Sequence, residues 1–275
     1  SDVDIVFLYD HEGMTFPTRR GRRSLESTTN AHFFSELAQR TMKVCNAFTP
    51  QGRLYELDSR LRPSGKSGPA ALSLAALDRY FAADGPAAVW ERQALVKARV
   101  MVGSRPAAAA AMQIVHRAAY ERQWTATEVA EIRAMRLRMQ EGAAPTNLKR
   151  GPGGVVDIEF IAQMLQLVHG GANPTLRVAE TLTALDALHA AGHLDAEDHA
   201  FLTGASRMLR SIEGRLRLLD ARGRHDFPDD PTELRALAHL LNAAGHEALA
   251  ADVQTLTARI RTTFERIFDQ VVAEL

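Results

Sequence analysis

The chain has 275 residues, enough for one large domain or two of ordinary size. It carries 33 basic and 33 acidic residues, and this zero formal charge argues against a protein that binds nucleic acid mainly through its phosphates. The single cysteine, Cys45, excludes an intramolecular disulfide and fits a reducing cytoplasm, and no apolar run approaches the about 20 residues of a membrane helix.

The first predicted element is a strand over residues 1–9. Asp2 and Asp4 lie two positions apart in it and therefore share one face. The apolar run Ile5–Tyr9 that follows is typical of a central strand buried on both faces. An Asp-x-Asp pair alone fits a solvated strand end as well as a site. At the mouth of a buried strand, it favours a site.

A helix is predicted over Asn30–Phe48, where apolar residues recur at helical spacing, and a break at 49–52 follows it. The second strand is predicted over residues 54–62. It places its charged residues on one face: Glu56, Asp58, Arg60 and Arg62.

The acidic residues of the two strands form a candidate metal site. If the strands are neighbours in one sheet, Asp2, Asp4 and Asp58 can converge on a hard divalent cation. Such a cation, Mg²⁺ above all, prefers oxygen ligands and serves phosphoryl or nucleotidyl transfer.

A loop rich in glycine, residues 63–69, follows the second strand. Beside a metal site its backbone amides can cradle phosphate oxygens, although it lacks the spacing of a Walker loop. Helices are predicted over 72–81 and 87–102. The second one carries Lys97 and Arg99, which can reach nucleotide phosphates or serve as ordinary surface charges.

Beyond residue 103 the composition changes, and almost every window has the 3.6-residue period of helices. We therefore place a domain boundary after residue 105 and predict an all-α bundle over residues 106–275. Helix starts are indicated by a capping box and two Asn-Pro or Asp-Pro pairs: Thr125–Glu128, Asn173-Pro174 and Asp230-Pro231. The tail, 248–275, is predicted to be one long amphipathic helix.

One segment of the helical region, Lys149–Phe160, is rich in glycine. Its three glycines and one proline precede a helix whose first turn holds Asp157 and Glu159. The segment is either a tight helix start with acids that complement the dipole, or an anion site of free amides with Lys149 as its cation.

Four motifs in chain order resemble the bacterial glutamine-synthetase adenylyltransferase family: Ser1–Asp4, Leu57–Gly65, Trp90–Arg99 and Lys149–Phe160. The likeness spans nearly the whole chain, and four separated motifs are far more specific than any one of them. It implies an α+β protein in which a nucleotidyltransferase domain of the polymerase-β type, residues 1–105, precedes a helical bundle, residues 106–275.

The resemblance also implies an activity. One catalytic half of the family enzyme attaches AMP from ATP to a tyrosine of glutamine synthetase, and the other removes it by phosphorolysis to ADP. Glutamine and the PII signal protein choose between them. Arg60–Gly65 and Val156–Phe160 look more like the attaching half. The removing half, and a docking module that has lost its chemistry, stay open as alternatives.

By the same resemblance, Asp2 and Asp4 bridge two Mg²⁺ ions, while Asp58 completes the metal nearer the attacking tyrosine hydroxyl and helps to deprotonate it. The expected nucleotide contacts are Ser1, Arg60, Arg62, Ser64, Lys97, Arg99, Lys149, Gly153 and Gly154. The superfamily's Gly-Ser turn, which binds phosphates, lies upstream of the first strand and is missing. Since the chain starts without methionine, we expect it to be a piece of a longer protein. No secretory leader is recognised, and together with the charge balance and the single cysteine this leads us to expect a cytoplasmic protein with no nucleic acid or membrane partner.

Overall fold

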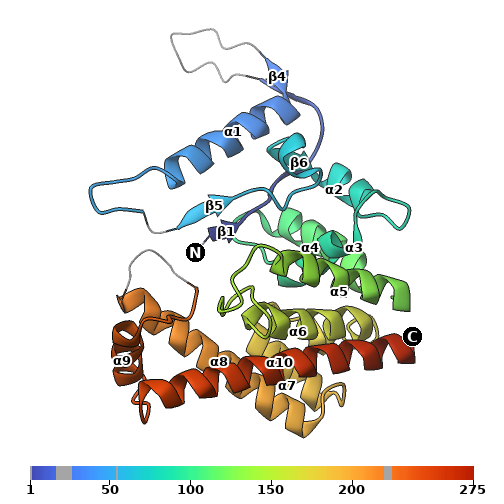
Figure 1. Ribbon diagram of the computed structural model, residues 1–275. Coiled ribbons are helices and arrows are strands. Elements are labelled where there is room, and N and C mark those ends of the chain that lie inside the picture. The colour runs from blue at the N-terminus through green and yellow to red at the C-terminus, as the bar shows by residue number, and fades with distance from the viewer. Residues whose placement is uncertain (1, 17–26, 54, 220–224) are drawn as a thin grey trace. The chain divides into compact units, whose positions relative to one another are not determined.

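The computed structural model describes residues 2–16, 27–53, 55–219 and 225–275, with the side chain of Asp2 outside the description. Within it the chain forms two compact units (Figure 1). One comprises the chain up to Ala94 together with Ala98–Ala118, and the other comprises Leu95–Lys97 and Ala119–Leu275. The described residues are mostly helical with a few short strands, which is compatible with the expected α+β class.

The first unit contains three pairs of short strands. Its parallel pairs are β1 (Asp2–Asp4) with β5 (Glu56–Asp58), and β2 (Phe7–Tyr9) with β6 (Ala71–Ser73). An antiparallel pair joins β3 (Met14–Thr15) to β4 (Thr28–Thr29).

The prediction of one continuous, fully buried strand over residues 1–9 is wrong. The backbone N–H of Ile5 still donates to the carbonyl of Asp58, at 2.7 Å, but from Phe7 onward the chain pairs with β6 instead of β5. This change of partner interrupts the strand, and it leaves Val6 38% exposed. The second predicted strand is also shorter than expected, because β5 ends at Asp58 and a turn follows.

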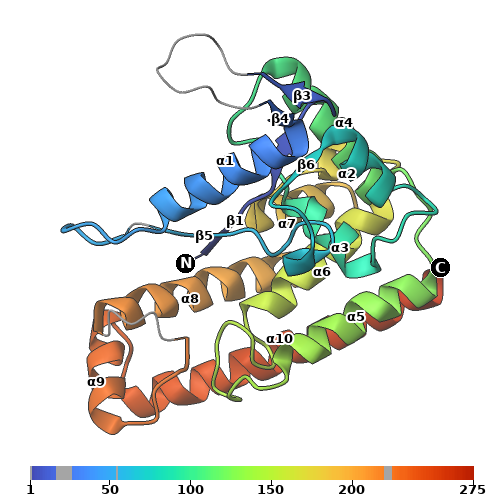
Figure 2. The same cartoon turned by 90° about the horizontal axis from the view of Figure 1, so that it is seen from above.

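The strands are backed by helix α1 (Asn30–Cys45), as the helical spacing predicted (Figure 2). The side-chain oxygen of Thr29 caps its start by accepting the N–H of His32, at 3.2 Å. Ala38 packs with Tyr9 and Ala71 in a small buried core, and the ring of Phe34 stacks on that of Tyr9 at 5.1 Å between centroids. The same core therefore fixes α1 against β2 and β6.

The other helices of this unit are short. They are the 3-10 turn η1 (Gly65–Ser67), α2 (Leu74–Tyr80), α3 (Val89–Ala94) and most of α4 (Arg105–Tyr120). The helix predicted from residue 72 begins later, because residues 71–73 pair as β6. The one predicted over 87–102 ends early, because the chain tightens into the 3-10 turn η2 (Leu95–Lys97).

The second unit is a helical bundle around α6 (Val155–His169), which is apolar on nearly all sides and buried accordingly. Helices α5 (Ala126–Gln140), α7 (Thr181–Ala190), α8 (Ala196–Leu219) and α10 (His246–Glu274) contact it, and α9 (Pro231–Leu240) packs on α8 and α10.

Local capping explains where several of these helices start. The predicted capping box is present at α5, where Thr125 and Glu128 exchange side-chain to backbone hydrogen bonds, and Asp230 caps α9 as expected. Asn173, by contrast, caps only the 3-10 turn η3 (Pro174–Leu176). The α7 helix begins later, with Glu180 as its N-cap.

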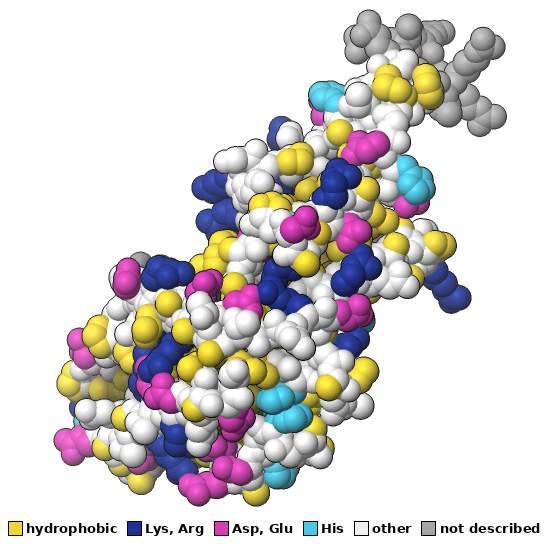
Figure 3. Space-filling view, turned by 90° about the vertical axis from the view of Figure 1, so that its right-hand side faces the viewer, with side chains coloured by type: hydrophobic (Ala, Val, Ile, Leu, Met, Phe, Trp, Pro, Cys, Tyr) yellow, Lys and Arg dark blue, Asp and Glu magenta, His cyan; other side chains and the backbone are white. Residues whose placement is uncertain are grey.

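The surface carries charges of both signs. On the face drawn in Figure 3, acidic and basic side chains are interspersed, in keeping with the zero net charge. Of the helices in the described ranges, none combines the length and the apolar character that a bilayer crossing requires.

Candidate active site

The register of the first strand pair brings two predicted site residues together. Asp4 on β1 lies opposite Asp58 on β5, so the two share one face of the parallel pair. Asp2 lies opposite Glu56, two positions earlier in the same strand, but its side chain is outside the described part, as is Ser1. The strand register therefore places two acids from distant stretches of sequence opposite each other, and their role as metal ligands stays a prediction.

Asp58 is held by the turn that follows it. Its Oδ1 accepts the backbone N–H of Arg60 at 2.8 Å, and its Oδ2 accepts the guanidinium Nε–H of the same residue at 2.5 Å. These hydrogen bonds, the guanidinium's first, outweigh partial burial and lower the pKa of the Asp58 carboxyl. Asp58 is consequently ionised at neutral pH, and it is paired with the guanidinium of Arg60, whose side chain is 62% exposed.

These acids fit a hard cation in their chemistry. Carboxylate oxygens are the ligands that Mg²⁺ prefers, and Asp4 and Asp58 are presented in register by adjacent strands. Within the described residues, no group of three or more His, Cys, Asp or Glu side chains is arranged to hold a metal ion. Asp2, the third ligand that the sequence predicts, has its side chain outside that set.

Arg62 was expected to face phosphate from a strand, and this placement is wrong. It lies in the turn after β5, where its guanidinium donates to the carbonyls of Ser59 (2.6 Å), Gly68 (3.2 Å) and Pro69 (2.9 Å). A further bond reaches Ser59 Oγ at 3.0 Å. Arg62 therefore closes the glycine-rich loop on itself, and a contact with phosphate remains a prediction.

Ser64 lies inside that loop in the left-handed conformation, with φ of 59°. Its backbone N–H approaches the hydroxyl of Tyr80, at 3.4 Å, and this hydroxyl in turn donates to Oε1 of Glu91, at 2.9 Å. Burial, more than the Glu91 hydrogen bond, raises the pKa of Tyr80, which keeps its hydroxyl protonated. Glu91 thus supports the loop through Tyr80, a role that the sequence motif alone did not reveal.

Arg92, the residue after Glu91, also has a structural role. It is 4% exposed and donates to the carbonyls of Phe81 (2.8 Å), Ala82 (2.7 Å) and Ala118 (3.5 Å), which ties α3 to α2 and α4. Arg99, in contrast, is exposed beyond the end of the helix. Glu91 and Arg92 of the motif at residues 90–99 therefore make hydrogen bonds within the protein, and Arg99 remains a predicted nucleotide contact.

Lys97 belongs to the second unit. Its ammonium donates to Thr181 Oγ1 at 2.8 Å and lies 3.6 Å from Oε1 of Glu159, which also pairs with Arg210 at 3.0 Å. The 37% exposed side chain is thus already paired, so a phosphate would have to compete with Glu159 for it.

Two residues of the glycine-rich motif, Gly151 and Asp157, are bound to the same buried arginine, Arg136. Asp157 and Arg136 have fully buried side chains, with Oδ1 of the acid 2.5 Å from the Nε of the base. Arg136 also donates to the carbonyl of Gly151 at 2.8 Å, and Arg261 lies 3.4 Å from Asp157. Burial lowers the pKa of Arg136, and the opposite charge of Asp157 offsets only part of that effect.

The amides of this helix start are not free, so the prediction of an open anion site here is wrong. The N–H groups of Val155 and Val156 donate to carbonyls of the preceding loop at 2.9 and 3.1 Å, and that of Gly154 does the same at 3.0 Å. The Gly153 N–H donates to Asp157 Oδ2 at 2.7 Å. These bonds and the buried Asp157 match the tight helix start, the other reading of the motif.

Packing also requires a glycine at position 153. With φ of +70° it adopts a left-handed conformation, and a Cβ there would lie 1.8 Å from the carbonyl oxygen of Thr257 on α10. Only glycine lets α10 pass this close. Lys149, at the start of the motif, is exposed, and its role toward nucleotide stays a prediction.

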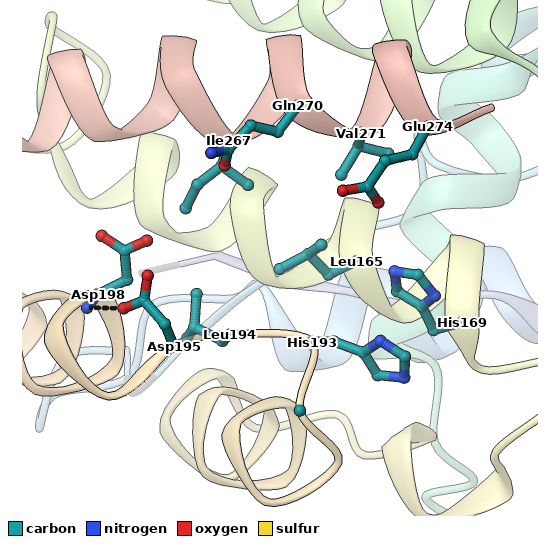
Figure 4. A pocket seen from close by; sticks show the side chains of 11 residues that line it. Leu165, His169, His193, Leu194, Asp195, Asp198, Ile267, Gln270, Val271 and Glu274 are labelled. Atoms are coloured by element: carbon teal, nitrogen blue, oxygen red, sulfur yellow. Dashed lines mark hydrogen bonds between the residues drawn. The ribbon is translucent and has the colours of Figure 1, made fainter.

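The second unit also has a hollow of about 170 Å³ that none of the predicted site residues lines (Figure 4). The imidazoles of His169 and His193 stack there at 3.8 Å between centroids, beside the carboxylate of Glu274. Burial, and then His193, lower the pKa of His169. Its lining combines these polar side chains with apolar ones that include Leu165 and Val271.

Two family models together match residues 1–268. Residues 1–114 match the model described as glutamate-ammonia ligase adenylyltransferase, and residues 112–268 match the one described as GlnD PII-uridylyltransferase. Both names describe enzymes that transfer a nucleotidyl group, and the matches meet within α4.

Curated relatives share the sequence over almost its full length. A protein of Stenotrophomonas maltophilia is 37% identical over 96% of the chain, one of Xanthomonas oryzae pv. oryzae 35% over 97%, and one of Ralstonia nicotianae 33% over 98%. Each is named bifunctional glutamine synthetase adenylyltransferase/adenylyl-removing enzyme. The chain belongs to the glutamine synthetase adenylyltransferase family. It spans 28% of the first two relatives and 30% of the third.

Proposed function

We propose that this chain is a catalytic half that transfers AMP from ATP to a tyrosine of glutamine synthetase and releases pyrophosphate. The observation that supports it most is the register of β1 and β5, which sets Asp4 opposite an ionised Asp58 in a chain of this family. In this proposal residues 1–105 are a nucleotidyltransferase domain of the polymerase-β type, and residues 106–275 are a helical domain.

The acids of β1 and β5 would hold the nucleotide's metal. Asp2, Asp4 and Asp58 supply carboxylate oxygens, and Mg²⁺, when bound, neutralises charge on the entering and leaving oxygens of the displacement. The lowered pKa of Asp58 favours a role as an ionised ligand over one as proton acceptor, because a weak base is poorly matched to a tyrosine hydroxyl of pKa about 10.

Among the predicted nucleotide contacts, the exposed cations are best placed to meet phosphate. Arg60, Arg99 and Lys149 are exposed, whereas Lys97 is paired with Glu159. The guanidinium of Arg60 pairs with Asp58, so it would lie at the edge of a metal held by that carboxylate, where it could neutralise a phosphate oxygen.

The motifs at Arg60–Gly65 and Val156–Phe160 are the reason that we propose attachment of AMP and not its removal. Glutamine synthetase is the proposed protein substrate, with the PII protein and glutamine as regulators of a cytoplasmic enzyme. The relatives' printed name covers attachment and removal alike, so the test has to separate the two activities.

The complete gene product that contains this chain is incubated with glutamine synthetase, Mg²⁺ and α-labelled ATP. Label on a glutamine synthetase tyrosine, independent of added phosphate, supports the proposal. Loss of label from pre-labelled substrate that requires phosphate and yields ADP would assign the removing activity instead. If neither reaction occurs but the protein still binds glutamine synthetase or PII, the docking module is the correct alternative.

A further inference from the structure

Asn46 joins the end of α1 to the strand that carries Asp58. Its side-chain Oδ1 accepts the backbone N–H of Leu57 at 2.7 Å, and its Nδ2 donates to the Leu57 carbonyl at 3.0 Å. A single amide side chain therefore satisfies both main-chain groups of the residue that precedes Asp58, as a neighbouring strand would.

The two edges of β5 are held by different partners. Successive residues of a strand direct their backbone groups to opposite edges. The Asp58 carbonyl accepts the N–H of Ile5 at 2.7 Å on the edge that faces β1, so the backbone groups of Leu57 face the other edge. Asn46 occupies that outer edge, and β5 is clamped between β1 on one side and Asn46 on the other.

Asn46 is itself firmly placed. It is the C-cap of α1, and its own N–H bonds back to the helix carbonyl of Met42 at 2.9 Å. Arg53 Nη1 donates to the Asn46 carbonyl at 3.4 Å. The buried core around Ala38 and Tyr9 fixes α1. Asn46, at the end of α1, therefore holds β5 in a defined position relative to that core.

We propose that Asn46 is a positioning residue of the active site, which holds the Asp58 carboxylate opposite Asp4. The inference rests on the proposed function, since it assigns to Asn46 the alignment of a metal-binding acid. Residues that orient metal ligands typically change metal affinity or activity by about 10- to 100-fold when replaced. A short two-stranded pair has little else to keep its outer edge in register.

The test compares Asn46→Ala with Asn30→Ala, at the opposite end of the same helix. Asn30 also makes two side-chain bonds, to the His11 carbonyl at 2.7 Å and from Thr15 Oγ1 at 2.8 Å, and neither of these bonds reaches β5. Each variant of the complete gene product is titrated with Mn²⁺, followed by electron paramagnetic resonance. Hydrogen exchange of the Leu57 amide and the Mg²⁺ dependence of AMP transfer are measured alongside.

Asn46→Ala should weaken Mn²⁺ binding and raise the Mg²⁺ needed for half-maximal transfer by about tenfold, with faster exchange at Leu57, while Asn30→Ala changes these values less than about twofold. Unchanged Mn²⁺ binding despite faster exchange would overturn the inference. So would an equal loss in both variants, which would mean a general loosening of α1.

Asn46→Asp provides a second variant should the alanine protein not fold. It keeps an acceptor for the Leu57 N–H but sets a carboxylate against the Leu57 carbonyl. An added negative charge alone would tighten Mn²⁺ binding, so weaker binding supports positioning, and tighter binding contradicts it. If wild-type protein binds Mn²⁺ but transfers no AMP, the proposed function fails while the Asn46 comparison still decides the positioning role. If it binds no Mn²⁺, both fail.

Discussion

Replacing Asp157 by Asn should severely destabilise the helical unit. The side chains of Asp157 and Arg136 are both fully buried, so the substitution leaves a buried guanidinium without its counter-charge. Arg261, whose guanidinium lies 3.4 Å from Asp157, loses the same counter-charge. Breaking a buried pair by removing one partner costs about 3–5 kcal/mol. An amide keeps the size of the side chain and can still accept the Gly153 N–H, so the loss isolates the charge.

The matched control is Glu159→Gln, two residues along the same helix. The Glu159 side chain is 23% exposed, and its partners Arg210 and Lys97 are 53% and 37% exposed, so loss of these partly exposed ion pairs should cost about 0–1 kcal/mol. Urea unfolding is followed by fluorescence in a Trp90→Phe background, in which buried Trp124 is the remaining tryptophan and reports on the helical unit.

A free energy of unfolding for Asp157→Asn within about 1 kcal/mol of that for Glu159→Gln would refute the reasoning. Adding Arg136→Met to Asp157→Asn should recover part of the loss, because it removes the unpaired buried charge. A double variant no more stable than Asp157→Asn would locate the cost in packing instead.

Gly153→Ala should cost about 3 kcal/mol or more, whereas Gly192→Ala, with φ of +80° but open space around it, should cost about 1 kcal/mol in thermal unfolding. Equal shifts in melting temperature would contradict the close approach of α10. Arg60→Gln should raise the pKa of Asp58 toward its ordinary value in an NMR titration of the carboxyl, and an unmoved midpoint would show that Arg60 does not stabilise the ion. Since the folded pKa lies below the unfolded one, this contribution to stability is complete above the unfolded pKa of about 3.9 and disappears as the pH falls through the folded pKa. Arg92→Met should cost about 2–4 kcal/mol in urea unfolding, because three backbone carbonyls lose a charged donor, and a cost below about 1 kcal/mol would count against its structural role.

Elements with a strong local signal could be predicted from the sequence. The capping box at Thr125 and the N-cap at Asp230 are recognisable because side chain and amide lie within three residues. The long C-terminal helix follows from its period. Strand alternation predicted that Asp4 and Asp58 could lie on one face if the two strands were neighbours. The observed register places them opposite each other.

Features that depend on distant partners could not be read from local patterns. Beyond Ile5 the chain changes strand partner, because from Phe7 it pairs with β6, a strand more than sixty residues later in the sequence. Arg62 alternates correctly for a strand, but the loop carbonyls offer it more hydrogen bonds in a turn. Asn46 looks like an ordinary helix end, and its bonds to Leu57 become visible only once β5 lies beside it.

The central claim is that the Asp58 carboxylate serves AMP transfer, and one comparison tests it most directly. In the complete gene product, transfer of label from α-labelled ATP to glutamine synthetase is measured for Asp58→Asn and for Asp78→Asn, whose 51% exposed carboxylate pairs with Arg117 at the surface of the same unit. Loss of a metal-binding carboxylate should remove several kcal/mol of transition-state stabilisation, so Asp58→Asn should slow transfer at least about a hundredfold while Asp78→Asn retains the wild-type rate. A folded Asp58→Asn protein that labels glutamine synthetase as fast as Asp78→Asn would contradict the account.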